Sequence, residues 1–121
     1  MKGDYRADVE ESIKALQSAI RKSERALAQI VHKGVSTTLI SKRLKALKVG
    51  LIILENGSNP LMNSVDRNEL SETKSTLQSL LPSIERIYRK ASLDSSQFTL
   101  LKRRIAALNL IVQLIDENEQ D

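Results

Sequence analysis

Cysteine is absent from this chain of 121 residues. Without thiols the chain has no disulfide framework, no thiol nucleophile, no iron–sulfur cluster and no cysteine-ligated zinc. Aromatic residues make up only 2% of the chain and tryptophan is missing, which disfavours the stacking platforms that read single-stranded nucleic acids. Two prolines and four glycines are too few for the many tight turns of an all-β fold.

Long apolar runs are missing as well. The most apolar uncharged stretch, residues 105–115, is well short of the ~20 residues that cross a bilayer, and the first residues lack the apolar core of a signal peptide. We therefore expect a cytoplasmic protein. The composition, 40% apolar and 28% charged, is that of a globular protein, and the length predicts a single domain over residues 1–121.

In the first half of the chain, apolar residues recur at alternating steps of four and three, the spacing of one helix face. The first stripe predicts a helix over residues 5–32, and the second predicts a helix that ends at about Asn56. Gly34 suits the left-handed end of the first helix. Because the connection is only a few residues long, residues 5–56 are predicted to form an antiparallel helical hairpin.

The second half repeats this organisation after a linker. Residues 57–68 are rich in Asn and Ser and predict a crossover loop. Residues 69–91 predict a third helix, in which Pro82 removes a backbone hydrogen bond or introduces a kink. Asp94 has the spacing of a capping residue for a fourth helix. The second predicted hairpin spans residues 69–117.

An internal repeat supports this division. When residues 11–55 are aligned with residues 72–116 without a gap, eleven of 45 positions are identical. The fold class predicted is all-α: an antiparallel four-helix bundle built from two duplicated helical hairpins. The second and fourth helices carry more apolar residues than one face needs, which indicates either central helices or a surface for a homodimer or for a partner groove.

Positive charge is concentrated towards the hairpin tips. Residues 21–48 and 82–104 together hold fourteen basic and three acidic residues, whereas the whole chain has a net charge of +4. In an up-down-up-down bundle both tips lie at one end, so we expect one basic end that attracts anions. The repeat predicts ion pairs across each hairpin, between Glu24 and Arg43 and between Glu85 and Arg104. The candidate anion-binding or nucleic-acid-binding residues are Lys22, Lys33, Lys42, Lys45, Arg89, Lys90, Lys102 and Arg103.

Support for catalysis is weak. His32 is the only histidine, and no phosphate-binding loop, nucleophile elbow or paired metal-ligand motif is present. We expect no cofactor, no metal and no enzyme activity. The leading hypothesis is a binding or adaptor protein whose basic tips engage an anionic partner, either an acidic protein or a nucleic acid.

One segment resembles a known family. Residues 34–47, with the sequence GVSTTLISKRLKAL, resemble the turn and recognition helix of helix-turn-helix transcription regulators. The resemblance implies a DNA-binding regulator that reads the major groove with the helix over residues 36–45. The implied reading residues are Ser36, Thr37, Thr38, Ser41 and Lys42. Residues 50–57 are similar to the strand and wing of winged-helix members, so a helix over residues 48–57 favours the bundle and two strands favour the winged helix. By analogy of fold alone, bacteriocin immunity proteins are a third possibility.

Overall fold

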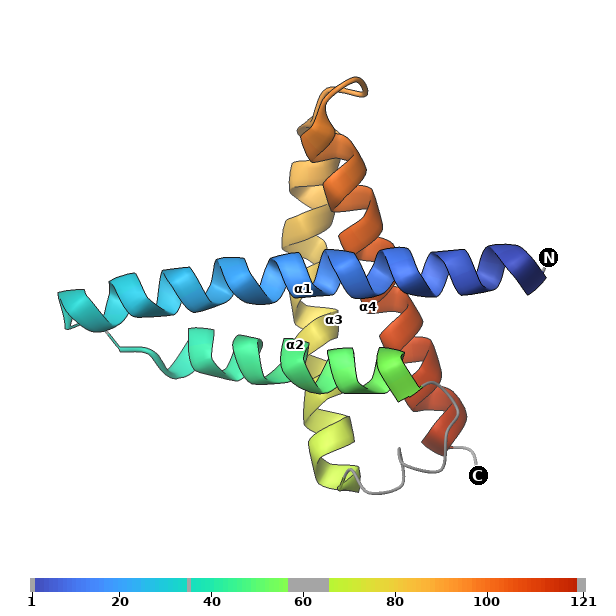
Figure 1. Cartoon of the computed structure of the whole chain (residues 1–121). Helices are drawn as coiled ribbons and strands as arrows, with labels where there is room; N and C mark the ends of the chain where they lie inside the picture. Colours follow the sequence, from blue (N-terminus) through green and yellow to red (C-terminus); the bar gives the residue numbers. More distant parts are fainter. Residues whose placement is uncertain (1, 35, 57–65, 120–121) are drawn as a thin grey trace.

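The structure, a computed structural model, describes residues 2–34, 36–56 and 66–119 (Figure 1). The four helices are α1 (Lys2–Lys33), α2 (Thr38–Asn56), α3 (Arg67–Lys90) and α4 (Ser96–Glu119). Every regular element over these ranges is a helix, and α1 packs on α2 as α3 packs on α4. The predicted all-α class with two helical hairpins is therefore confirmed.

Two of the helix ends have well-defined local causes. Gly34 adopts a φ of 72°, the left-handed conformation that glycine favours, and its N–H donates to the carbonyl of Val31 at 3.2 Å. The predicted end of the first helix is thus confirmed. At the start of α3, the Asp66 carboxylate accepts a hydrogen bond from the Asn68 backbone N–H at 3.2 Å. This helix begins two residues earlier than predicted, and the crossover loop is shorter at that end.

The cap of α4 differs from the prediction by one residue. The hydroxyl of Ser95, not the carboxylate of Asp94, accepts a hydrogen bond from the Phe98 backbone N–H at 3.1 Å. The same hydroxyl donates to the carbonyl of Ser92 at 2.8 Å. Ser95 is the capping residue because its single hydroxyl both closes the preceding turn and accepts the bond from the first turn of the helix.

Residues 48–56 and Pro82 both lie within continuous helices. α2 is helical through residues 48–56, so the strand of a winged helix is wrong there, and Gly57 lies outside the described residues. α3 runs as one helix through Pro82 from Arg67 to Lys90. By the criterion set above, the helical course of residues 48–56 favours the bundle.

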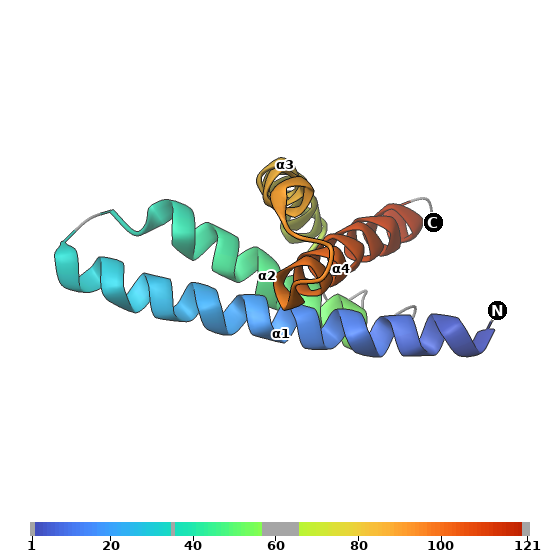
Figure 2. The same cartoon turned by 90° about the horizontal axis from the view of Figure 1, so that it is seen from above.

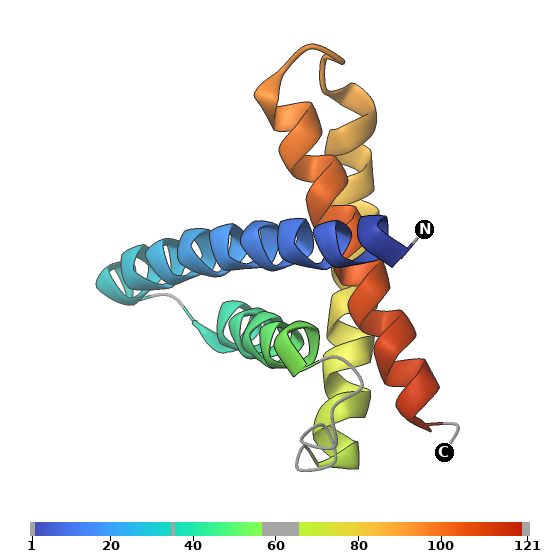
Figure 3. The ribbon, with the colours of Figure 1, turned by 45° about the vertical axis from the view of Figure 1, so that its right-hand side comes forward.

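The two hairpins lie crosswise (Figures 1 and 3). The hairpin of α1 and α2 runs across the hairpin of α3 and α4, and the view from above shows the same crossing (Figure 2). The expectation that both tips lie at one end, and that the molecule has one basic end, is therefore wrong. The tips of the hairpins point in different directions.

The crossing follows from an approximate two-fold relation between the hairpins. α1 contacts α4 just as α3 contacts α2, and α2 contacts α4 over a short stretch. In this contact Gly50 of α2 lies against Ile111 of α4, and the two residues occupy equivalent positions in the repeat. A Cβ atom on residue 50 would lie only 2.8 Å from Ile111 Cδ1. Glycine at position 50 therefore allows α2 and α4 to approach closely where they cross.

The crossing also explains why α2 and α4 are apolar around much of their circumference. Each of them contacts three other helices, whereas α1 and α3 each contact two. Ile53, Ile111 and Ile115 are fully buried in the core that the four helices share. The apolar breadth thus serves central helices. Even so, none of the helices in the described ranges is long and apolar enough to cross a membrane.

Candidate functional site

The eight predicted basic residues are all exposed, but they do not form one patch. Four of them lie on the first hairpin and four on the second, and the two tips point apart (Figure 1). Lys33 ends α1 and Lys90 ends α3, so these two lysines lie at different tips. The structure brings the predicted residues together only in smaller sets.

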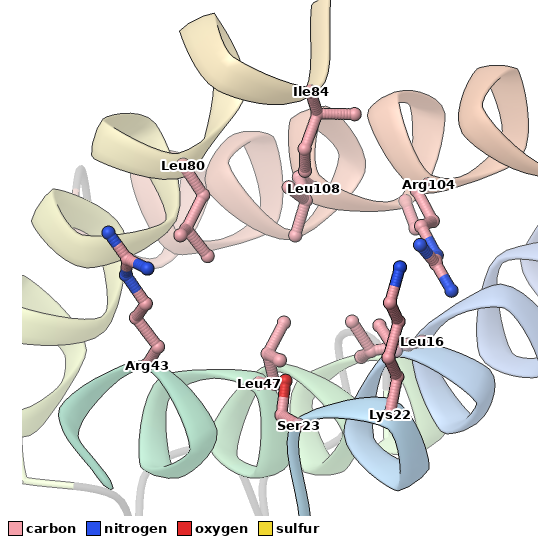
Figure 4. A pocket seen from close by; sticks show the side chains of 11 residues that line it. Leu16, Lys22, Ser23, Arg43, Leu47, Leu80, Ile84, Arg104 and Leu108 are labelled. Carbon is pink, nitrogen blue, oxygen red and sulfur yellow. The ribbon is translucent and has the colours of Figure 1, made fainter. Parts of the chain in front are cut away.

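The predicted ion pairs across the hairpins are wrong. Glu24 pairs with Lys48, with 3.4 Å between Oε2 and Nζ. Glu85 pairs with Arg89 one helical turn later, at 4.0 Å between Oε2 and Nη2. Among the described residues Arg43 and Arg104 form no ion pair, because their side chains face the opposite hairpin instead (Figure 4).

A groove of about 770 Å³ lies between α1 and α4, and its lining extends from the tip of the second hairpin to Gln113. Residues at helical spacing on α4 form one wall, from Phe98 through Lys102 and Ala106 to Leu110. Leu93, in the loop at the tip, is 77% exposed at the end of this groove. The full lining is Glu11, Ser12, Leu93, Phe98, Thr99, Lys102, Arg103, Ala106, Leu110 and Gln113.

Charge in this groove is only partly balanced. Arg103 Nη1 lies 3.2 Å from Glu11 Oε2, which ties α4 to α1 across the groove. Lys102 has no ion-pair partner among the described residues and is exposed. The groove therefore combines exposed apolar side chains with a free cation, and two of the eight predicted residues line it.

Stacked aromatic rings support the tip next to this groove. Tyr88 on α3 and Phe98 on α4 stack with their ring centroids 4.7 Å apart and their planes at 25°. Such pairs contribute about 0.5–1.5 kcal/mol beyond the apolar area that they bury. The stack fixes Phe98 at the wall of the groove.

The repeat-related groove, between α3 and α2, is almost closed at about 20 Å³. There the long side chain of Lys45 lines the hollow at the position that corresponds to Ala106. Lys42 and Lys45 lie beside Glu69 and Glu72 in this small hollow. Acidic neighbours therefore offset the positive charge of these two predicted residues, and the open groove is specific to the second half of the repeat.

A second hollow, of about 300 Å³, lies where the hairpins cross (Figure 4). We call it the central cavity. Arg43 from α2 lies on one side, and Lys22 from α1 and Arg104 from α4 lie on the other side. Leucine and isoleucine side chains lie between them. The lining consists of Leu16, Ala19, Lys22, Ser23, Arg43, Leu47, Leu80, Ile84, Arg104, Ala107 and Leu108.

Arg104 is the most constrained cation of the central cavity. Its Nε atom is buried and has no hydrogen-bond partner among the described residues. Burial lowers the pKa of Arg104 from its usual value, because desolvation disfavours the charged guanidinium. Arginine nevertheless stays protonated in proteins, so a partly desolvated positive charge borders the cavity.

Reasoning from the sequence missed Arg43 and Arg104 as site residues. They had been assigned to ion pairs from their distance to the hairpin tips alone. The signal that could have found them is the repeat, in which the two arginines are identical at equivalent positions. In a two-fold arrangement, equivalent side chains near the axis face the same space.

The remaining candidates are dispersed. His32 is exposed in the last turn of α1 and belongs to no metal-binding cluster among the described residues. Ser36, Thr38 and Ser41, implied as DNA-reading residues, are exposed at the start of α2. Comparisons with protein-family models, with curated protein sequences and with solved structures found no match to this chain.

Proposed function

We propose that this protein acts by binding, and that the groove between α1 and α4 receives an acidic amphipathic helix of a partner protein. One observation carries this proposal: Leu93, 77% exposed, lies at the end of a groove that combines Phe98 and Leu110 with Lys102. Exposed apolar side chains beside cations suit a partner with an apolar face and an acidic edge. This is the anionic partner that the basic tips predict.

The shape of the groove supports a helical partner. Its wall on α4 extends from Phe98 to Gln113, which is about 22 Å at 1.5 Å per residue. A partner helix of about 15 residues has the same length and presents its anchors at steps of three and four. Lys102 lies midway between the apolar anchors Phe98 and Ala106, where it can pair with a glutamate on the edge of that helix.

Fluorescence anisotropy with designed peptides tests the proposal. The probe is a labelled peptide of about 16 residues with leucines on one helical face and glutamates beside them, and its control is a scrambled peptide of the same composition. We expect the ordered peptide to bind better than the scrambled one. Leu93→Ser and Lys102→Glu should each weaken binding about tenfold or more, since like charge in an interface is strongly unfavourable. Lys33→Glu, the same charge change at the other tip, is the matched control and should bind as the wild type does.

Two results would overturn this assignment. The first is equal binding of the ordered and scrambled peptides. The second is equal weakening by Lys33→Glu and Lys102→Glu, which would indicate attraction by net charge alone.

In the same assay, duplex DNA at about 50 and 200 mM salt tests the helix-turn-helix hypothesis. Steeply salt-dependent and sequence-dependent binding, weakened by Lys42→Ala, would transfer the function to the start of α2, where Ser36, Thr38 and Ser41 are exposed.

We further propose that this binding takes place in the cytoplasm and that the single chain is the binding unit. A homodimer through α2 would have to use Leu39 and Ile52, whose exposed fractions are 60% and 47%. These two side chains are thirteen positions apart in the sequence, about 20 Å along the helix. Sedimentation velocity of the wild type and of Leu39→Ser measures the oligomeric state directly. We expect one monomeric species for both.

A further inference from the structure

The central cavity shares no lining residue with the groove between α1 and α4. Its chemistry differs as well. Seven of its eleven lining residues are apolar, three are cationic, one is Ser23, and none is acidic. Apolar walls with cations and no acidic residue suit a ligand that has an apolar body and an anionic head.

The cations of the cavity lack ion-pair partners in the part of the chain that the structure describes. Lys22, Arg43 and Arg104 form no ion pair among the described residues, and the Nε of Arg104 is buried without an acceptor. Buried donors in proteins nearly always have an acceptor, so this guanidinium requires one. A carboxylate offers two acceptor oxygens in the geometry that arginine recognises.

The approximate two-fold relation places this charge symmetrically. Arg43 and Arg104 occupy equivalent positions of the repeat, as do Leu47 and Leu108, and all four line the cavity. Figure 4 shows the two arginines on opposite sides with leucines between them. An anionic head can therefore meet a guanidinium at either side while its apolar body lies on the leucines.

The size limits the ligand. A volume of about 300 Å³ is at the lower end for ligand sites. A ligand at this end of the range is small, on the order of ten non-hydrogen atoms. We propose that the central cavity is a binding site for a small amphipathic monoanion, an aliphatic carboxylate of about eight carbons, whose head is held by Arg43 or by Arg104. This site is independent of the peptide groove.

Isothermal titration calorimetry of the full chain with octanoate tests this site. We expect a Kd on the order of 10⁻⁴ M, as suits a ligand of this size. Acetate has the head without the body, while octylamine and 1-octanol have the body without the anion. We expect none of these three to bind measurably at the same concentrations.

Substitutions then assign the head group. Arg104→Gln and Arg43→Gln should each weaken octanoate binding about twofold, because each removes one of the two head positions, and the double variant should weaken it about tenfold or more, because no charged hydrogen-bond donor then remains at either side. Arg21→Gln, an exposed arginine of α1 that does not line the cavity, is the matched control and should leave the Kd unchanged. If the double variant fails to fold by circular dichroism, the losses in the two single variants, measured against Arg21→Gln, still test the assignment.

The outcomes are separable from those of the peptide assay. Leu93→Ser should not alter octanoate binding, since Leu93 lies in the other hollow. Absence of octanoate binding overturns the inference, and so does equal binding of octanoate and octanol, because the arginines would then contribute nothing. Octyl phosphate that binds much more tightly than octanoate would overturn the carboxylate assignment and identify the head group as phosphate.

Discussion

Replacement of Gly50 by alanine should destabilise the protein even though alanine is the better helix former. The new Cβ would lie 2.8 Å from Ile111 Cδ1 and 3.7 Å from its Cγ1 and Cγ2. Ile111 is fully buried, so its side chain has little room to move away. Overpacking of this kind costs about 1–3 kcal/mol, while alanine in place of glycine within a helix gains about 1 kcal/mol. We expect a net loss of about 1 kcal/mol in the free energy of unfolding.

A double-mutant cycle isolates the contact. Ile111→Val removes the Cδ1 atom and by itself costs about 1 kcal/mol. In the double variant, the new Cβ meets only atoms at 3.7 Å, an ordinary van der Waals distance. The clash disappears and the gain in helix propensity remains, so the double variant should be as stable as the wild type within about 0.5 kcal/mol. The coupling energy between the two positions should therefore be about 2 kcal/mol and favourable.

Urea unfolding followed by circular dichroism at 222 nm measures all four proteins of this cycle. The slope of the free energy against urea should stay the same, because the surface exposed on unfolding hardly changes. A Gly50→Ala protein about 1 kcal/mol more stable than the wild type, with no coupling to Ile111→Val, would refute the close approach of α2 and α4. Helix propensity alone would then account for the substitution.

Three further predictions concern stability. Leu77→Ala should cost about 2–5 kcal/mol in urea unfolding, because Leu77 is fully buried and truncation leaves a cavity; a loss below about 1 kcal/mol would contradict its place in the core. Phe98→Leu should cost about 1 kcal/mol and weaken the near-ultraviolet circular dichroism of Tyr88, because the ring stack is lost; an unchanged spectrum would count against the stack. The ion pair between Lys74 and Asp116 joins two partly exposed side chains, and its coupling energy in a double-mutant cycle should stay below about 1 kcal/mol and fall as salt is added; a larger, salt-independent value would contradict this.

The helices could be predicted from the sequence because their signals are local. The apolar stripes and Gly34 lie within the segments that they shape, and the structure has all four helices near the predicted ranges. The crossing of the hairpins could not be predicted, since it depends on how side chains far apart in the sequence fit together where α1 meets α4 and α2 meets α3 and α4. Gly50 and Ile111 meet where α2 and α4 cross, and no pattern along either helix reveals that contact.

The candidate sites were predictable only in part. Counting charge along the chain identified Lys102 and Arg103, which line the groove. The same count could not tell Lys42 from Lys102, although Lys42 lines a small hollow with two glutamates and Lys102 lines an open groove whose glutamate, Glu11, pairs with Arg103. The assignment of Arg43 to an ion pair failed because position along a hairpin does not specify which neighbouring helix a side chain faces.

The contact between Gly50 and Ile111 bears on how a duplicated chain differs from a dimer. At a two-fold axis, a residue in a homodimer meets its own copy. Two copies of the first hairpin would place glycine against glycine and leave a gap, and two copies of the second would place isoleucine against isoleucine and clash. Fusion of the two halves into one chain removes that restriction, because each half can change without its partner. A single polypeptide can therefore place isoleucine against glycine at this axis. A symmetric pair of identical hairpins cannot.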